Sequence, residues 1–479
     1  MQRSRFLLFV ILVVLLLGLF LILDGCAANK EQGTGTASTF PVIDEALDVI
    51  KDKGVYPVEQ ELLIEGALRG MADVIGDPYS TYLTQEEAAA HKESLAGERI
   101  GIGAEVTRSN GKFIIVAPMK GSPSEKAGLQ PYDEIVQIDG ERLDGKSLQD
   151  VVQRIRGKRG TTVTMTIYRP DLNKHLEVPV IRDAIAVKTV SAEMMEIRDK
   201  KIGYISLTKF AEESAKEWEK ATNKLINEGA QSLIIDVRGN PGGYLHTVGD
   251  IAGSLLPEDT VFAFMQDAQG ALTPLVTEAS EDYAYDEKLK KMPIVLLQDK
   301  GSASASEVLS GALKDLKRGY IMGVTSFGKG TVQDITELSN GGEMKLSTHK
   351  WLTPKEKWIH GKGVKTDLEV AQKALFSEHI RLVAEVYKDG DYHDDIAYGQ
   401  RLLDGLGYSV GRQDGYFDES TARAVHAFRV DSKVKVDESM DRVFFTALKG
   451  QVEAFRDDRQ NDEQLQMALG YINHKMGEN

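Results

Sequence analysis

Cysteine is nearly absent from this sequence. Cys26 is the single cysteine among 479 residues, which excludes an intramolecular disulfide framework and a multi-cysteine metal site. Positive charge is not in excess either: the formal net charge of -15 argues against a polyanionic ligand such as nucleic acid. Glycine and proline are too dilute for a fibrous or wholly disordered chain. The composition that remains is typical of a globular protein, and the chain is long enough for about three domains.

One long hydrophobic run lies at the N-terminus. A short basic stretch, Gln2 to Arg5, precedes apolar or glycine residues from Phe6 to Leu23, as in a signal peptide or a membrane helix. The next residues, ending in Gly25-Cys26, resemble a bacterial lipobox, in which cleavage leaves a lipid-carrying cysteine, although Asp24 departs from it. A lipidated Cys26, an uncleaved anchor within residues 1–26 and a plain secretory signal stay open.

All three alternatives predict the same location for the body of the chain. Because the basic residues precede the apolar run and stay inside, the rest of the chain is expected outside the cytoplasm. The lipidated and the uncleaved alternatives would also attach it to the membrane of a bacterial cell envelope. Residues 27–40, rich in Gly, Thr, Ser and Ala, are typical of a flexible tether.

Residues 41–96 have apolar side chains at helical spacing, for example Ile43, Leu47 and Ile50. We expect a helical N-terminal region that packs on a neighbouring element or on a second subunit. Thr84 is placed to cap a helix that begins at Gln85.

Residues 97–183 change to short β-rich runs around two short helices. The region resembles a PDZ domain in three segments: Gly101-Ile102-Gly103, Gly121 to Leu129, and Asp133 to Val136 followed by Asp139-Gly140. A glycine-bracketed loop exposes backbone N–H groups that can receive a carboxylate, and the following strand offers an open edge. A substrate C-terminus is therefore expected to bind at Gly101, Ile102, Gly103 and Val151, with a core position as the alternative for Val151. Tyr132 stands where the family usually has glycine.

From residue 184 to 375 strands and helices alternate. This alternation predicts an α/β core with its site at the strand ends. Residues 394–450 resemble a small helical peptidoglycan-binding domain, carried by the segments 400–408, 414–417 and 421–428. Arg429 replaces a common glutamine, so glycan binding and a packing or dimerisation role both stay open. Residues 451–479 read as a charged helical tail.

Ser304 begins the most informative segment of the core. Ser304 and Glu307 fit a capping box, and an apolar stripe shows that a helix follows. A serine at a strand-to-helix turn is also a common place for a nucleophile, because the helix N-terminus favours a developing oxyanion. The local sequence alone does not decide between the two.

Lys329 and Gln333 add the partners that a serine nucleophile needs. A lysine acts as a general base only when neutral, so its pKa has to fall from about 10.4 toward 7. Burial can lower the pKa in this way. Gly328 and Gly330 allow close backbone approach, and Phe327 and Val332 are expected to exclude water. Gln333, four residues on in an extended stretch, shares a face with Lys329 and can orient the amine.

Taken together, these segments identify the chain as resembling a carboxy-terminal processing (tail-specific) protease from residue 41 to about 370. The resemblance implies Ser304 as nucleophile, Lys329 as general base and Gln333 as the residue that positions the base. The loop from Asp236 to Gly243 matches the family's glycine loop, whose amide at Gly242 or Gly243 would join that of Ala305 in an oxyanion hole. Ser302 and Ser306 are the rival nucleophiles.

The sequence thus predicts a multidomain α+β protein: a helical N-terminal region, a PDZ domain, an α/β Ser/Lys protease core and a small helical C-terminal domain. The expected activity is an extracytoplasmic serine endopeptidase that recognises substrate C-termini and cleaves envelope or secreted proteins. A catalytically silent PDZ scaffold is the alternative. No cofactor or metal site is implied. The partners expected are protein C-termini, the membrane and, as open alternatives, peptidoglycan and a second copy of the chain.

Overall fold

The computed structural model describes residues 40–476 except 97, 110, 120–121, 187, 279–281, 379, 382 and 384. Contacts within the chain divide it into one unit that ends at Pro78 and a second that begins at Tyr79. The predictions for residues 1–26, Cys26 included, lie outside the described part. Among the described residues, no helix has both the length and the hydropathy that crossing a membrane requires.

The first unit contains the helices α2 (Pro41–Lys53) and α3 (Gln60–Asp73). This confirms the expected helical N-terminal region. No residue of α2 is buried, so its apolar side chains, among them Val42 and Ile50, lie exposed.

The second unit begins with a strand that the sequence analysis did not predict. β1 (Thr81–Leu83) pairs antiparallel with β18 (Glu343–Leu352), so Thr81 lies opposite Lys345. α4 (Gln85–Ala96) follows, and Thr84 caps it as expected: its hydroxyl accepts from the Glu87 N–H at 3.3 Å, and the Glu87 carboxylate accepts from the Thr84 N–H at 2.9 Å. The predicted helical region 41–96 is therefore divided between the two units.

The PDZ domain is built on one sheet of six strands in the order β3-β4-β5-β7-β8, with β6 on β5. A separate ribbon pairs β2 with β9. The helices of the PDZ domain are α5 (Pro123–Lys126) and α6 (Leu148–Ile155). The strands are β2 (Glu98–Gly101), β3 (Ala104–Ser109), β4 (Lys112–Pro118), β5 (Glu134–Ile138), β6 (Glu141–Arg142), β7 (Thr162–Arg169), β8 (Lys174–Ile181) and β9 (Asp183–Ala186).

Tyr132, the position at which the sequence departs from the PDZ resemblance, adopts a φ of 69°. This left-handed conformation costs a residue with a side chain about 1–2 kcal/mol. Its hydroxyl accepts a hydrogen bond from Thr446 at 3.0 Å, and Arg442 lies 5.5 Å from its ring centroid. The departure from the family pattern thus supplies a contact between the PDZ domain and the C-terminal helical region.

The protease core has a central sheet of six strands in the order β10-β11-β12-β15-β16-β19, parallel except for the β10–β11 pair. Its strands are β10 (Val190–Ile197), β11 (Lys200–Leu207), β12 (Ser232–Asp236), β15 (Ile294–Gln298), β16 (Tyr320–Gly323) and β19 (Leu368–Glu369). A second sheet joins β1 and β18 to β13 (Val261–Gln266), β14 (Leu272–Val276) and β17 (Thr331–Glu337).

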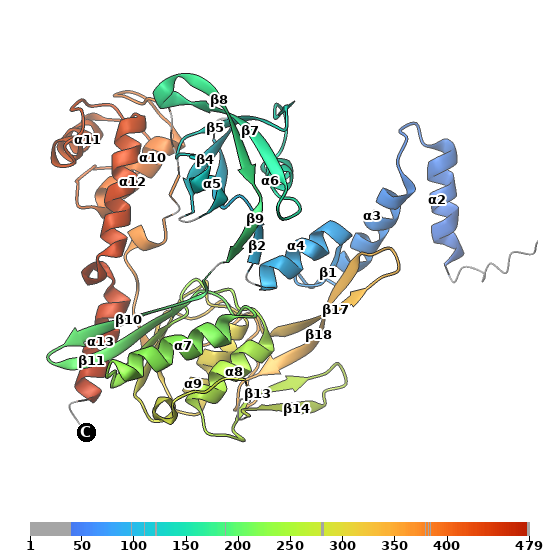
Figure 1. Cartoon of the computed structure of the whole chain (residues 1–479), viewed down its shortest axis with the longest axis vertical. Helices are drawn as coiled ribbons and strands as arrows, with labels where there is room; N and C mark the ends of the chain where they lie inside the picture. The colour runs from blue at the N-terminus through green and yellow to red at the C-terminus, as the bar shows by residue number, and fades with distance from the viewer. Residues whose placement is uncertain are drawn as a thin grey trace, which may run out of the picture. The chain divides into compact units, whose positions relative to one another are not determined.

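Side chains alternate between the two faces of the central sheet, as strands require. Ile205, Ile235 and Leu296 pack with the helices α7 (Ser214–Asn227), α8 (Leu245–Leu255) and α9 (Ala305–Asp315). Their neighbours along the strands, Tyr204 and Ile234 among them, pack with α13 (Glu463–Lys475). α13, seen at the lower left of Figure 1, contacts β12, β15 and β16 of this sheet. The segment expected to be a charged tail therefore covers one face of the protease sheet.

The C-terminal helical region comprises α10 (Asp394–Gly405), α11 (Glu419–Asp431) and α12 (Arg442–Asp457), which share a core of their own. The predicted boundary at residue 450 falls within α12. Arg429, the departure from the glycan-binding pattern, is fully buried. It donates to the carbonyl oxygens of Lys435 and Ser439 and to Asp441 at 2.6 Å, so it holds together the loop before α12.

Candidate active site

Ser304 lies at the turn between β15 and the first residue of α9, and its backbone has φ 54° and ψ −116°. A residue other than glycine rarely adopts a positive φ, and such strain clusters at active sites. The turn places Ser304 at the helix N-terminus, where unpaired backbone N–H groups and the helix dipole favour negative charge.

The rival serines are engaged in the structure of the turn. Ser302 is buried and donates to the carbonyl oxygen of Val237 at 2.7 Å. Ser306 is also buried and donates to the carbonyl oxygen of Asn240 at 2.9 Å. Ser304 alone of the three lines the pocket described below. Ser302 and Ser306 instead tie the Ser304 turn to the glycine loop.

Glu307 links the serine turn to the lysine loop. Its side chain is fully buried, and one carboxylate oxygen accepts from the backbone N–H groups of Ser304 at 2.9 Å and Lys329 at 2.8 Å. The other oxygen accepts from the Ser326 hydroxyl and the Gly328 N–H, both at 2.6 Å. The capping-box spacing predicts only the contact with Ser304; the contacts with residues 326–329 come from the fold.

The backbone around Lys329 is held by two indole rings. Trp351 donates to the carbonyl oxygen of Lys329 and Trp358 to that of Gly330, each at 2.8 Å. A Cβ at Gly328 or Gly330 would lie within 3.0 Å of neighbouring atoms, so both glycines allow the close approach that the sequence analysis expected.

Phe327 does not fill the role expected of it. Its side chain is 55% exposed, so it cannot shield Lys329 from water. Val332, by contrast, is partly buried and packs against the protease core.

The glycine loop packs directly against the serine turn. A Cβ at Gly242 would lie 2.8 Å from the Cβ of Ser304 and 3.0 Å from the backbone nitrogen of Ala305, so only glycine fits. The N–H of Gly242 donates to the Asn240 side chain at 2.9 Å. Among the residues that the structure describes, no partner is present for the N–H of Gly243 or of Ala305.

One pocket of about 380 Å³ brings the predicted catalytic residues together: Gly242, Gly243, Ser304, Ala305, Lys329 and Gln333 all line it. The Lys329 amine lies 4.9 Å from the centroid of the Tyr79 ring. The Gln333 amide donates to the hydroxyls of Thr331 at 3.1 Å and Ser347 at 3.0 Å. The pocket thus holds a hydroxyl, an amine and an amide, while their catalytic roles stay predictions.

The pocket also contains residues that the sequence analysis missed. His91, on α4, is one of them, and burial together with the charges of Lys345 and Lys209 lowers the pKa of its imidazole. Both lysines line the same pocket. These residues come from parts of the chain far apart in sequence, so no local motif could have indicated them.

In the PDZ domain Val151 takes the core position that was the alternative to a place in the peptide groove. A cavity of about 1030 Å³ is lined by Ile100, Leu148 and Val152 together with residues of α4. Val151 is fully buried in the PDZ core, as is Ile102, so Val152 rather than Val151 faces the groove. Gly101 and Gly103 flank Ile102 at the start of the domain, and Gly121 lies outside the described residues.

Four protein-family models match parts of the chain. Peptidase family S41 matches residues 201–370, and the PDZ domain matches residues 114–169. The activating protease CtpB N-terminal domain matches residues 23–87, and the putative peptidoglycan binding domain matches residues 392–448.

Curated relatives match over most of their length. Carboxy-terminal processing protease CtpB of Bacillus subtilis is 39% identical over 427 residues, which cover 89% of this chain and 88% of the relative. Carboxy-terminal processing protease CtpA of the same organism is 32% identical over 484 residues, covering 99% of this chain and 100% of the relative.

Replacing the Glu307 carboxylate by an amide tests its structural role. Because an amide cannot accept from donors on both sides, Glu307→Gln should lower the free energy of unfolding by about 3 kcal/mol, through buried donors left unpaired. Urea denaturation measures the change. Glu337→Gln, at an exposed position of β17, is the matched control and should change stability by less than about 0.5 kcal/mol. Equal stability of the two variants would contradict this role.

Proposed function

The chain belongs to the carboxy-terminal processing serine proteases of peptidase family S41, and from this premise we propose that Ser304 and Lys329 form its catalytic dyad. The observation that carries the proposal is the single pocket lined by Ser304, Lys329, Gln333 and the glycine loop. The structural roles of Ser302 and Ser306 support Ser304 as the nucleophile.

The proposed reaction is acyl transfer. The neutral amine of Lys329 takes the proton of the Ser304 hydroxyl, and the Ser304 oxygen attacks a peptide carbonyl carbon. When the C–N bond breaks, the leaving amine receives the proton from Lys329. The Lys329 amine then takes a proton from a water molecule, whose oxygen attacks the ester carbonyl carbon. The C–O bond to Ser304 breaks, and Lys329 returns the proton to the Ser304 oxygen.

The surroundings of Lys329 support a neutral amine. Lys209 and Lys345 line the same pocket, and like charges disfavour the charged form of each other. The Tyr79 ring acts in the opposite direction, because an aromatic face attracts an ammonium group. The proposal requires the lysines and burial to outweigh the ring.

For the oxyanion we propose the backbone N–H groups of Gly243 and Ala305. Gly242 is less suited as a donor because its N–H is bonded to Asn240. Gly242 serves instead as the point of close contact with Ser304. Donors fixed before the reaction stabilise developing charge without reorganisation.

For substrate recognition we propose that the PDZ domain binds protein C-termini in the groove beside Val152 and α6. An extended chain end would add to the sheet edge, with its carboxylate at the Gly101–Gly103 segment. The C-terminal region, matched to a putative peptidoglycan binding domain, would then bring the protease to its envelope substrates.

Proteolysis by purified variants tests the dyad. The full-length chain in mild detergent should degrade an unstructured protein with an apolar C-terminus, and Ser304→Ala and Lys329→Ala should each lower the rate by about 10³-fold or more. Lys357→Ala, which changes an exposed lysine, is the control and should keep the rate within twofold. Equal degradation by all four preparations would overturn the mechanism.

For the location we propose an extracytoplasmic protein attached to a bacterial membrane by lipid on Cys26, supported by the basic, apolar and cysteine order of residues 2–26. The intact mass of the membrane-extracted protein decides: lipidation predicts a chain that begins at Cys26 with added acyl mass. An unmodified chain that retains residues 1–25 would contradict lipidation and establish an uncleaved anchor. A homodimer through the helical N-terminal and C-terminal regions stays a prediction, which analytical ultracentrifugation tests.

A further inference from the structure

The C-terminal helix α13 belongs structurally to the protease core, although it lies outside the residues that the four family models match. Leu465, Ala468, Leu469 and Ile472 form one buried stripe of the helix. They pack on Ile202, Tyr204 and other residues of the sheet face opposite α7, α8 and α9. Fully burying one such leucine or isoleucine stabilises the fold by about 1.5–3 kcal/mol.

Asp462 lies at the N-cap of this helix and is 3% exposed. It accepts from the Leu465 N–H at 3.0 Å, as an N-cap does. Its two carboxylate oxygens also accept from the two terminal nitrogens of Arg238, each at 2.8 Å. Gln372 donates to the same carboxylate at 2.6 Å, and Gln464 accepts from Arg238 at 3.0 Å.

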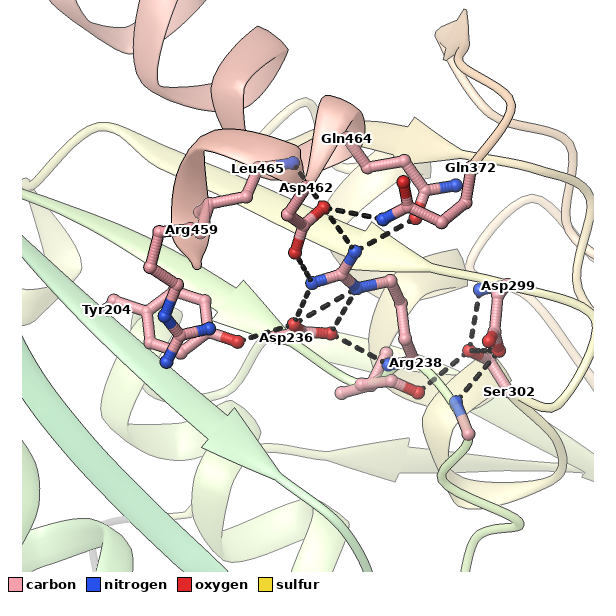
Figure 2. A network of polar contacts seen from close by, with 12 residues as sticks. Tyr204, Asp236, Arg238, Asp299, Ser302, Gln372, Arg459, Asp462, Gln464 and Leu465 are labelled. Atoms are coloured by element: carbon pink, nitrogen blue, oxygen red, sulfur yellow. Dashed lines mark hydrogen bonds and ion pairs between the residues drawn. The ribbon is translucent and has the colours of Figure 1, made fainter. Parts of the chain in front are cut away.

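Arg238 lies between two carboxylates, as Figure 2 shows. On the side away from Asp462 its guanidinium donates to Asp236 at 2.5 to 3.0 Å. The Tyr204 hydroxyl donates to the same carboxylate at 2.6 Å. Burial opposes the charged form of Asp462, but Arg238 outweighs it, so the pKa of Asp462 lies below its ordinary value.

The glycine loop starts within this network. Asp236 ends β12, and Arg238 directly precedes the segment Gly239 to Gly243. Within that segment the Asn240 carbonyl accepts from the Ala303 N–H at 3.0 Å and from Ser306 at 2.9 Å, next to Ser304. A shift of Arg238 would therefore move the loop that packs on Ser304.

We propose that Asp462 is a positioning residue of the protease: through Arg238 it fixes the glycine loop beside Ser304, so catalysis requires the N-terminus of helix α13. The inference rests on the proposed role of Gly243 in binding the oxyanion. Without the Asp462 carboxylate, the outer nitrogens of Arg238 lose their bidentate partner, and a planar guanidinium depends on such paired acceptors for its orientation.

The test is Asp462→Asn in the full-length chain. Asparagine caps helices as well as aspartate does, so α13 keeps its start and its buried stripe. In this variant, however, the amide NH2 group faces an N–H donor of Arg238, and two donors cannot form a hydrogen bond with each other. We expect kcat to fall about tenfold or more, as for small misplacements of reacting groups, while KM changes less than twofold. The rate at which a fluorophosphonate acylates Ser304 should fall by a similar factor.

Lys200→Met is the matched control. Lys200 donates to the carbonyl oxygen of Asn473 at 2.9 Å, so it also joins α13 to the sheet, but at the far end of the helix. It should keep both rates within twofold. A purely structural role for Asp462 would reduce the number of sites that the fluorophosphonate labels and leave the rate per labelled site unchanged, which would overturn the proposal.

Two further outcomes are separated by design. If Asp462→Asn does not fold, Gln464→Leu removes one acceptor of Arg238 and should lower the rate per labelled site about threefold, the loss expected for one weakened contact; no change would overturn the proposal. Unchanged rates in Asp462→Asn, beside a Ser304→Ala variant without activity, would refute the role of Asp462 and leave the dyad standing. Normal cleavage by Ser304→Ala would instead refute the dyad.

Discussion

The site depends on the hydrogen bonds that the buried carboxylate of Glu307 accepts. The Glu307 side chain is fully buried, and its two oxygens accept four hydrogen bonds from protein donors, as a buried polar group requires. Those donors come from the serine turn and from the loop before β17, including the backbone N–H of Lys329. The relative position of the proposed nucleophile and base is therefore set through the main chain.

The start of the glycine loop is held by a second buried group of charged side chains. Arg238 lies between Asp236 at the end of β12 and Asp462 at the start of α13, while the serine hydroxyls of residues 302 and 306 tie the loop to the serine turn. The catalytic turn is thus fixed from two sides. One set of contacts reaches the loop before β17, and the other reaches the C-terminal helix.

Much of this arrangement could be predicted from the sequence. Ser304, Lys329 and Gln333 stand in short segments whose residue types suggest their chemistry, and the family resemblance supplied their relation; the structure adds that all three line one pocket. The register of α6 was not predictable in the same way. Val151 and Val152 are both apolar neighbours, so only the packing of the helix shows which one is buried.

Long-range contacts account for what the sequence analysis missed. Glu307 has the spacing of a capping box, and nothing local indicates that its second oxygen binds Gly328. The apolar residues of α13 have helical spacing, but a charged amphipathic helix gives no sign of which sheet face it covers. β1 is only three residues long and is defined by its pairing with β18, more than 250 residues later in the chain.

The most direct test of the central claim is to locate the reactive serine. Treating the full-length chain with a fluorophosphonate and sequencing the labelled peptide by mass spectrometry should place the adduct on Ser304, with labelling lost in Lys329→Met. An adduct on Ser302, Ser306 or any other serine, or efficient labelling of Ser304 without Lys329, would contradict the account.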